Sequence, residues 1–164
     1  METIKIPGNT SKTKKEGVNH VLTRSYFVFF AILLIAVVLD IIYPIRIISS
    51  SLIIPIGITF LVLGSFFIVW AQKTSRILMG IKTPPTKKDF ARGPYAFLRG
   101  PTHVGVTLLL LGFGLLMNSI IIIILSFVAN LISRKIFLRK EEELLANNYG
   151  DEYEKYKREV RSWF

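Results

Sequence analysis

Residues 104–133 read VGVTLLLLGFGLLMNSIIIIILSFVANLIS, an apolar run with one polar interruption at Asn118 and Ser119. A single helix of this length would be about 45 Å long, well beyond the roughly 30 Å of a bilayer's hydrocarbon core. The interruption therefore predicts a tight helical hairpin. Each arm is then about 15 residues long, slightly short for a full span, so we expect tilting, thinning of the bilayer or partial insertion.

Two further apolar segments precede this hairpin. Residues 26–43 form a predicted first span with Asp40 as their only charge, near the outer end, where we interpret it as an interfacial acid. Residues 51–71 form a second span, interrupted by Pro55 and Gly57. Small residues that allow close approach of a helix or a ligand recur on the second span and the first hairpin arm: Gly57, Gly64, Gly105, Gly112 and Gly114.

Positive charge gathers beside these spans. The chain has a formal net charge of +10, a 51% hydrophobic composition and a mean hydropathy of +0.49. Basic residues that flank apolar runs are typical of the cytoplasmic ends of membrane helices and argue against nucleic-acid binding. Segment 72–100 carries seven basic residues against Asp89, and residues 1–24 carry five, whereas the outer loop has only Arg46. We therefore expect a multi-pass membrane protein with four spans and both termini cytoplasmic.

The C-terminal third continues as helix. No helix breaker separates the last span from Glu141, so we expect this helix to leave the bilayer with Glu142 on the face of Leu131 and Leu138. A final amphipathic helix carries an apolar face made of Tyr149, Tyr153, Tyr156 and Val160. The predicted fold is an all-α membrane bundle of about four spans, the last two forming the hairpin, plus amphipathic C-terminal helices. It comprises a polar cytoplasmic tail, residues 1–24, and a single domain, residues 25–164.

The sequence offers few catalytic groups. Cysteine is absent, which excludes disulfides, thiolate nucleophiles and cysteine metal sites. The two histidines, His20 and His103, lie in no ligand cluster, so we expect no metal site, and no serine sits in a Gly-x-Ser-x-Gly turn. What remains is Arg99 and His103 before the hairpin, and the pair Glu141-Glu142 after it. The hairpin brings these two segments together at the cytoplasmic membrane surface.

Such a site suits a zwitterionic cofactor. An arginine can hold a carboxylate through two hydrogen bonds, and a glutamate can accept hydrogen bonds from an ammonium or a ribose hydroxyl. S-adenosylmethionine carries all of these groups. Its sulfonium is already an activated electrophile, so methyl transfer demands alignment and desolvation rather than a nucleophilic side chain.

Three motifs follow one another along the chain, and their order carries a resemblance. They are Gly64-x5-Trp70-Ala71, then Gly93-Pro-Tyr95-x3-Arg99-x-Pro101-x3-Gly105, then Glu141-Glu-x2-Leu145-x3-Tyr-Gly-x2-Tyr153-x2-Tyr156-x3-Val160-Arg161. This succession resembles the isoprenylcysteine carboxyl methyltransferase family, whose broader group includes phospholipid methyltransferases, over about residues 55–161. The resemblance implies a membrane-embedded S-adenosylmethionine site within about residues 93–161 and an apolar acceptor that enters from the bilayer. It implies that Arg99 and Glu142 contact the cofactor, and that Tyr95, Pro101 and Glu141 shape the same pocket.

The chain departs from the family pattern at two places. Where the family usually has Arg-His-Pro-x-Tyr, this chain has Arg99-Gly-Pro-Thr-His103, so Gly100 replaces the histidine and His103 replaces the tyrosine. The C-terminal Val-Pro-Arg-x-x-Pro pattern is reduced to Val160-Arg-Ser-Trp-Phe164, without prolines. His103 can substitute as a ring donor to the cofactor. The alternative is that cofactor binding is weakened or lost.

We therefore predict an S-adenosylmethionine-dependent methyltransferase that acts on a lipid or lipid-like acceptor, with Arg99 and His103 as catalytic candidates. The predicted cofactor-binding residues are Tyr95, Arg99, Pro101, His103, Glu141 and Glu142. A carboxylate acceptor needs no general base, whereas a protonated amine needs His103 or the glutamate pair. Two alternatives stay open: a nicotinamide-dependent membrane lipid reductase, because membrane sterol reductases are similar in the C-terminal region, and a non-catalytic lipid-binding or scaffold protein. The oligomeric state stays open as well.

Overall fold

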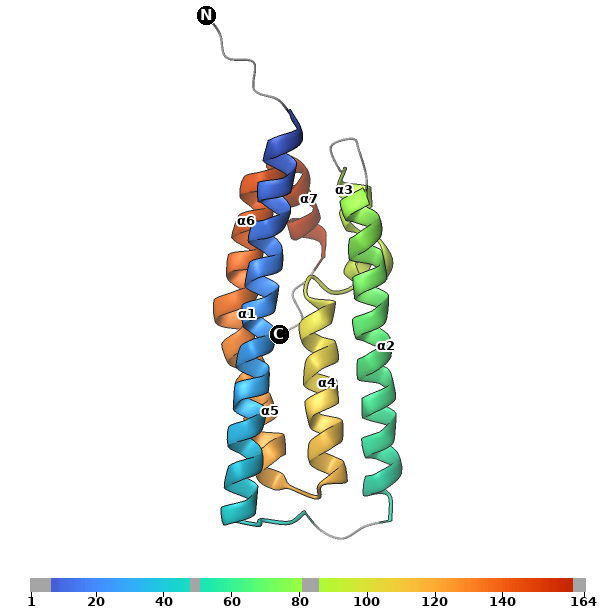
Figure 1. Ribbon diagram of the computed structural model, residues 1–164. Helices are drawn as coiled ribbons and strands as arrows, with labels where there is room; N and C mark the ends of the chain where they lie inside the picture. Colours follow the sequence, from blue (N-terminus) through green and yellow to red (C-terminus); the bar gives the residue numbers. More distant parts are fainter. Residues whose placement is uncertain (1–6, 48–50, 81–85, 161–164) are drawn as a thin grey trace, which may run out of the picture.

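The computed structural model describes residues 7–47, 51–80 and 86–160, with side chains for residues 23–47, 51–78 and 86–160. Within these ranges the chain is helical, and the long helices run side by side (Figure 1). The elements are α1 (Pro7–Ile42), α2 (Ile53–Gly80), α3 (Lys87–Phe90), the 3-10 turn η1 (Gly93–Ala96), α4 (Pro101–Leu116), α5 (Ile120–Ser133), the π-helical turn η2 (Arg134–Leu138), α6 (Arg139–Tyr149) and α7 (Asp151–Glu159). Residues 1–6 of the predicted tail and residues 161–164 of the last motif lie outside the described residues.

Three stretches are long and apolar enough to cross a membrane: Thr23–Ile42, Ile53–Leu78 and Ile120–Tyr149. The fourth apolar helix, α4, has only 16 residues. Large apolar side chains such as Phe27, Leu34 and Val62 are exposed on the outside of the bundle, where lipid would cover them. The predicted all-α membrane bundle is therefore confirmed, and the chain is a membrane protein.

Two helices are longer than the sequence pattern suggested. Helix α1 begins at Pro7, so the segment expected as a polar tail is helical from that residue onward. Helix α2 continues to Gly80, so the expected loop after Ala71 starts with more than two turns of helix. Pro55 does not interrupt α2 because it lies in the first turn, where a backbone N–H has no acceptor to lose.

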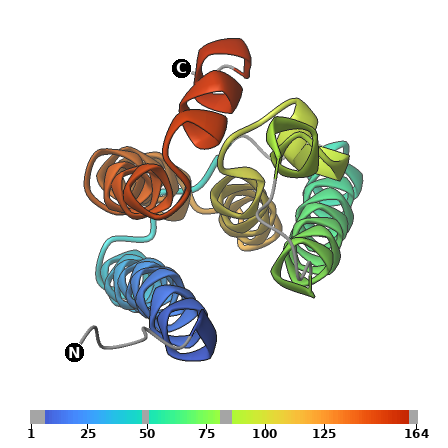
Figure 2. The same ribbon diagram turned by 90° about the horizontal axis from the view of Figure 1, so that it is seen from above.

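Helices α2 and α4 pack with their backbones in close approach. A Cβ atom on Gly64 would lie 2.7 Å from the Gly105 carbonyl oxygen, and one on Gly112 would lie 2.8 Å from the Gly57 carbonyl oxygen. Any larger residue would push the helices apart. The glycines therefore serve helix packing, and they hold α4 between α2 on one side and α5–α6 on the other (Figure 2).

The hairpin turns where the sequence predicts it. Asn118 has a φ of 53°, and the Ser119 hydroxyl accepts a hydrogen bond from the Ile122 amide, 3.2 Å away, as the N-cap of α5. Arg46 anchors this turn, because its Nη1 donates to the Met117 carbonyl at 3.0 Å and to Asp40 Oδ2 at 3.1 Å. Asp40 is thus a buried ion-pair partner that ties α1 to the hairpin.

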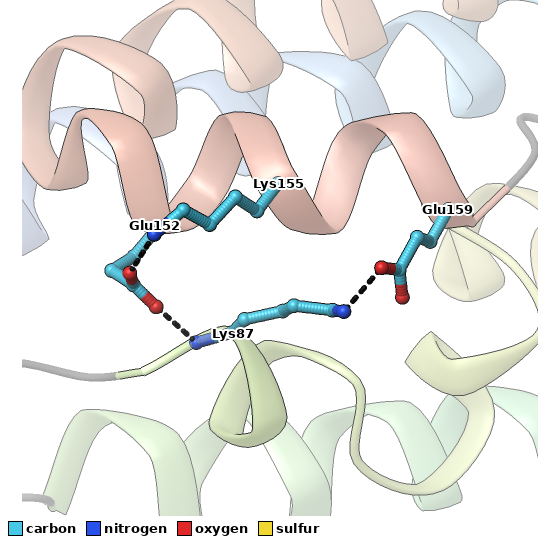
Figure 3. Close-up of polar contacts among 4 residues, drawn as sticks. All are labelled: Lys87, Glu152, Lys155 and Glu159. Carbon is cyan, nitrogen blue, oxygen red and sulfur yellow. Dashed lines mark hydrogen bonds and ion pairs between the residues drawn. The ribbon is translucent and has the colours of Figure 1, made fainter.

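Helix α7 docks on α3 at the opposite end of the bundle. Phe90 packs against Tyr153, Tyr156 and Val160, which confirms the predicted apolar face. Lys87 makes two polar contacts with α7 at the edge of this apolar cluster. Its backbone N–H donates to Glu152 Oε2 at 3.0 Å, and its ammonium pairs with Glu159 (Figure 3). The docked helix also contacts α6, and its Tyr156 hydroxyl donates to the Tyr95 carbonyl of η1.

Candidate functional site

The π-helical turn η2 decides which residues of the last long helix face the interior. The buried residues of α5 recur at intervals of four, three and four: Ile122, Ser126, Ala129 and Ser133. The next buried residue is Leu138, five positions on, because a π-turn carries one extra residue. A regular helix would have turned Ile136 or Phe137 inward instead, and Ile136 is 45% exposed.

The glutamate pair faces inward as a result. The side chains of Glu141 and Glu142 are 15% and 13% exposed, whereas Glu143 is exposed. The prediction that Glu142 shares a face with Leu131 is wrong, since Leu131 is 56% exposed on the outside of α5. The expectation assumed a regular helical period, and the π-turn shifts that period by one residue.

Arg99 and Glu142 form an ion pair across the hairpin. Arg99 Nη1 lies 3.0 Å from Glu142 Oε1, and both side chains are only 13% exposed. Lys157 of α7 lies 3.8 Å from the other carboxylate oxygen, Oε2. Arg99 Nε is buried and has no hydrogen-bond partner. The structure therefore brings together the two segments that the sequence pairs, and it leaves one buried donor of Arg99 unused.

His103 is buried among partners from three helices. Its Nδ1 lies 2.8 Å from Ser133 Oγ and 3.3 Å from Ser25 Oγ, and the two hydroxyls lie 3.1 Å apart. Its Nε2 faces Glu141 Oε2 at 3.5 Å and makes no hydrogen bond. Sequence reasoning missed both serines. Only Ser133 carried a signal, because it continues the buried four-and-three spacing of α5.

Tyr95 lies in η1 and Pro101 begins α4, so the two residues flank Arg99 along the chain. The Tyr156 hydroxyl donates to the Tyr95 backbone carbonyl at 2.8 Å. Burial, and to a lesser degree the carboxylate of Glu141, raise the pKa of the Tyr95 phenol to about 12. The phenol thus stays neutral at physiological pH. Pro101 is buried at the start of α4, where its fixed φ suits the first helical turn.

A cavity of about 800 Å³ adjoins Arg99 and His103. Its lining comes from α2, η1, α4, α5, η2 and the turn before α4: Phe67, Trp70, Pro94, Phe97, Leu98, Arg99, Gly100, His103, Val104, Thr107, Leu108, Phe127, Asn130, Leu131, Arg134 and Leu138. Phe97, Phe127 and Leu131 are themselves largely exposed on the outside of the bundle. The cavity therefore meets the surface that the bilayer covers. The resemblance implied an acceptor that enters from the bilayer, but the sequence pattern did not indicate which side chains would line the cavity.

The charged lining is confined to one end of this cavity. Arg99 precedes α4 and Arg134 follows α5, so both lie at the end of the bundle where α7 docks. One turn deeper along α4, Thr107 accepts a hydrogen bond from Asn130 Nδ2 at 2.6 Å. Among the described side chains, no three histidine or acidic groups gather as a metal site.

The family comparison covers most of these residues, with Ser25, Tyr156 and Lys157 outside the matched range. A family model described as phospholipid methyltransferase matches residues 26–152, from α1 to the start of α7. No curated protein and no solved structure matches the chain. The matched region includes both halves of the hairpin, the Arg99–Glu142 pair and the cavity. The chain therefore belongs to the phospholipid methyltransferase family.

Proposed function

We propose that this chain is a membrane-embedded, S-adenosylmethionine-dependent methyltransferase that acts on a lipid or lipid-like acceptor. The observation that carries the proposal is the position of Arg99. Its guanidinium pairs with Glu142 on one side and lines an apolar cavity on the other. A polar cofactor and an apolar acceptor can thus meet at this residue.

The residues present fit the polar end of S-adenosylmethionine. Arg99 Nε is a buried donor without a partner, and a cofactor carboxylate would give it one. The Glu142 carboxylate can accept from an ammonium or a ribose hydroxyl. If a cofactor carboxylate drew Arg99 away, Glu142 would keep Lys157 as a nearby cation at 3.8 Å. The Arg99 guanidinium would then pair with the cofactor carboxylate, and the Glu142 carboxylate would lie near Lys157, so neither buried charge would lack a counterion.

The cofactor, when bound, supplies a methyl group that is already activated on a sulfonium. The chain's own contribution is alignment and the exclusion of water. Arg99 and Glu142 hold the polar groups, while α7 covers this end through the Phe90, Tyr153 and Tyr156 cluster. His103 adds an Nε2 atom without a hydrogen-bond partner beside the cavity.

The cavity supports a lipid as the acceptor. Its volume of about 800 Å³ lies within the range of roughly 300–1,000 Å³ that is typical of ligand pockets. Apolar walls that reach the bilayer-facing surface let an acyl chain enter sideways without crossing water. The basic residues that flank the polar end of the bundle favour a cytoplasmic location for this end and for both termini.

Methyl transfer tests the proposal. The purified protein is reconstituted in vesicles of a total polar lipid extract and given S-adenosylmethionine labelled in the methyl group. We expect label in the lipid phase, with a loss of at least tenfold in Arg99→Ala and Glu142→Ala and little change in Arg92→Ala and Glu143→Ala. Arg92 and Glu143 are exposed neighbours of the two site residues and serve as matched controls. NADPH-dependent reduction of the lipids, without methyl transfer, would assign the alternative reductase function instead.

A further inference from the structure

Arg134 is the second arginine of the cavity, and its surroundings differ from those of Arg99. Arg99 is neutralised by Glu142 at 3.0 Å. Arg134 lines the same cavity, and no acidic side chain lies within ion-pair distance of it among the described residues. The cavity lining itself contains arginine and histidine but no aspartate or glutamate. The polar end of the cavity therefore carries a positive charge that no acidic side chain in the described part of the chain balances.

The charged and apolar groups of the cavity follow the same order along the membrane normal as the headgroup and chains of a lipid in one leaflet. Arg134 begins η2, directly beyond the last residue of α5. Leu131 and Phe127 lie on α5 one and two turns deeper, and both line the cavity. A molecule whose chain lies along Leu131 and Phe127 would thus present its head to Arg134. This is the order of groups in a membrane lipid, from the interface inward.

The chemistry of the guanidinium narrows the class of headgroup. Arginine presents a planar set of donors that fits a phosphate through two hydrogen bonds, and the interaction is stronger where the site is partly buried. Arg134 is partly buried at the rim of an apolar cavity. A neutral headgroup would leave its charge unbalanced in these surroundings.

We infer that Arg134 is a specificity-determining residue that binds the phosphate of the acceptor lipid's headgroup. The inference rests on the proposed function, because it assigns this cavity to the methyl acceptor. Arg134 is a binding residue for the acceptor, and Arg99 remains the residue for the cofactor. Arg99 thus binds the carboxylate of the cofactor, and Arg134 binds the phosphate of the acceptor lipid.

Trp70 provides a direct probe, since it lines the cavity. The chain has two tryptophans, so Trp163→Phe leaves Trp70 as the only indole. Lipids with brominated chains quench an indole that they touch. We expect brominated phosphatidylglycerol, in micelles of a neutral detergent, to quench Trp70 saturably at a mole fraction about tenfold lower than brominated diacylglycerol. Arg134→Gln should remove this preference, and Arg134→Lys should retain part of it.

The control is Arg139→Gln, which removes an exposed charge from the next helical turn and should leave the preference intact. An unchanged preference in Arg134→Gln, or an equal loss in Arg139→Gln, would overturn the inference. Displacement of the quenching lipid by millimolar inorganic phosphate would also overturn it, because the site would then bind a free anion. Saturable S-adenosylmethionine binding by Arg134→Gln shows that this variant is folded. If S-adenosylmethionine fails to bind even the unaltered protein while the Arg134-dependent preference stands, the proposed function fails and the lipid site remains.

Discussion

Arg99 Nη1 lies 3.0 Å from Glu142 Oε1, although one residue precedes α4 and the other follows α5 by two turns. Two features of the chain create this contact. The hairpin returns the end of α5 to the level where α4 begins, and the π-turn then rotates the glutamates inward. The site therefore depends on the geometry of helices whose own residues are mostly apolar.

The close approach of α2 and α4 predicts a strong effect at Gly64. In Gly64→Ala the new Cβ would meet the Gly105 carbonyl oxygen at 2.7 Å, which is backbone and cannot rotate away. We expect a loss of about 1–3 kcal/mol in the free energy of unfolding, measured as a lower melting temperature in detergent. Ser65→Ala, at the exposed neighbouring position, is the control. Equal melting temperatures for the two variants would contradict the backbone packing.

The docking of α7 depends on apolar burial rather than on its ion pairs. Phe90→Ala removes a ring that is 4% exposed and contacts Tyr153 and Tyr156, so we expect a cost of about 3–5 kcal/mol. Lys87→Ala removes an exposed ion pair with Glu159 and should cost at most about 1 kcal/mol. Limited proteolysis near residue 150 should be fast only in Phe90→Ala. Rapid cleavage of Lys87→Ala would show that the contact in Figure 3 holds the helix.

The orientation of His103 depends on Ser133. Ser133→Ala removes the 2.8 Å contact with Nδ1 and leaves Ser25 at 3.3 Å, so we expect a loss of about 1–3 kcal/mol in stability and weaker S-adenosylmethionine binding. Ser126→Ala is the matched control, because Ser126 is buried on the same stripe and bonds only the Ile122 carbonyl of its own helix. Calorimetric titration and thermal melting measure the two effects. If Ser126→Ala weakens cofactor binding as much, the role assigned to Ser133 is wrong.

The raised pKa of the Tyr95 phenol predicts that the protein loses stability at alkaline pH. Its folded pKa is raised to about 12 from an ordinary value of 10.0, chiefly by burial. Below pH 10 the phenol is protonated in both states, so its contribution is fully present there. As the pH rises from about 10 to about 12, the unfolded state loses the proton first and the free energy of unfolding falls. Thermal melts across this window should decline less steeply in Tyr95→Phe than in the unaltered protein, and parallel curves would contradict the assignment.

The sequence predicted those parts of the fold that follow from length and polarity. The run 104–133 is too long for one span, so a turn at Asn118 was required, and the structure has it. The π-turn could not be predicted in the same way. Residues 134–138 contain no helix breaker, and the extra residue places Leu138 against Gly100, where a Cβ atom would lie 3.0 Å from Leu138 Cδ1. The preference of residues 134–138 for a π-turn over a regular helix therefore comes from tertiary packing.

The sequence predicted that the segments of Arg99 and Glu142 meet, which the structure shows, and it missed the two serines beside His103. Arg99, Glu141 and Glu142 stand out because they flank the hairpin and lie in the motifs that carry the family resemblance. Ser25 and Ser133 do not, since a buried hydroxyl in an apolar helix has no distinctive sequence pattern. Their contact with His103 depends on how α1, α4 and α5 rotate about their axes. The cavity likewise depends on which side chains α2, α4 and α5 leave unpacked.

Binding of S-adenosylmethionine to the detergent-purified protein tests the central claim most directly. Isothermal titration calorimetry is run on the unaltered chain and on Arg99→Ala, Glu142→Ala, Arg92→Ala and Glu143→Ala, each with S-adenosylmethionine and with NADPH. We predict saturable binding of S-adenosylmethionine alone, weakened at least tenfold in Arg99→Ala and Glu142→Ala and unchanged in the two exposed controls. Binding of NADPH instead, binding of neither compound, or S-adenosylmethionine binding that survives the loss of Arg99 and of Glu142 would contradict the account.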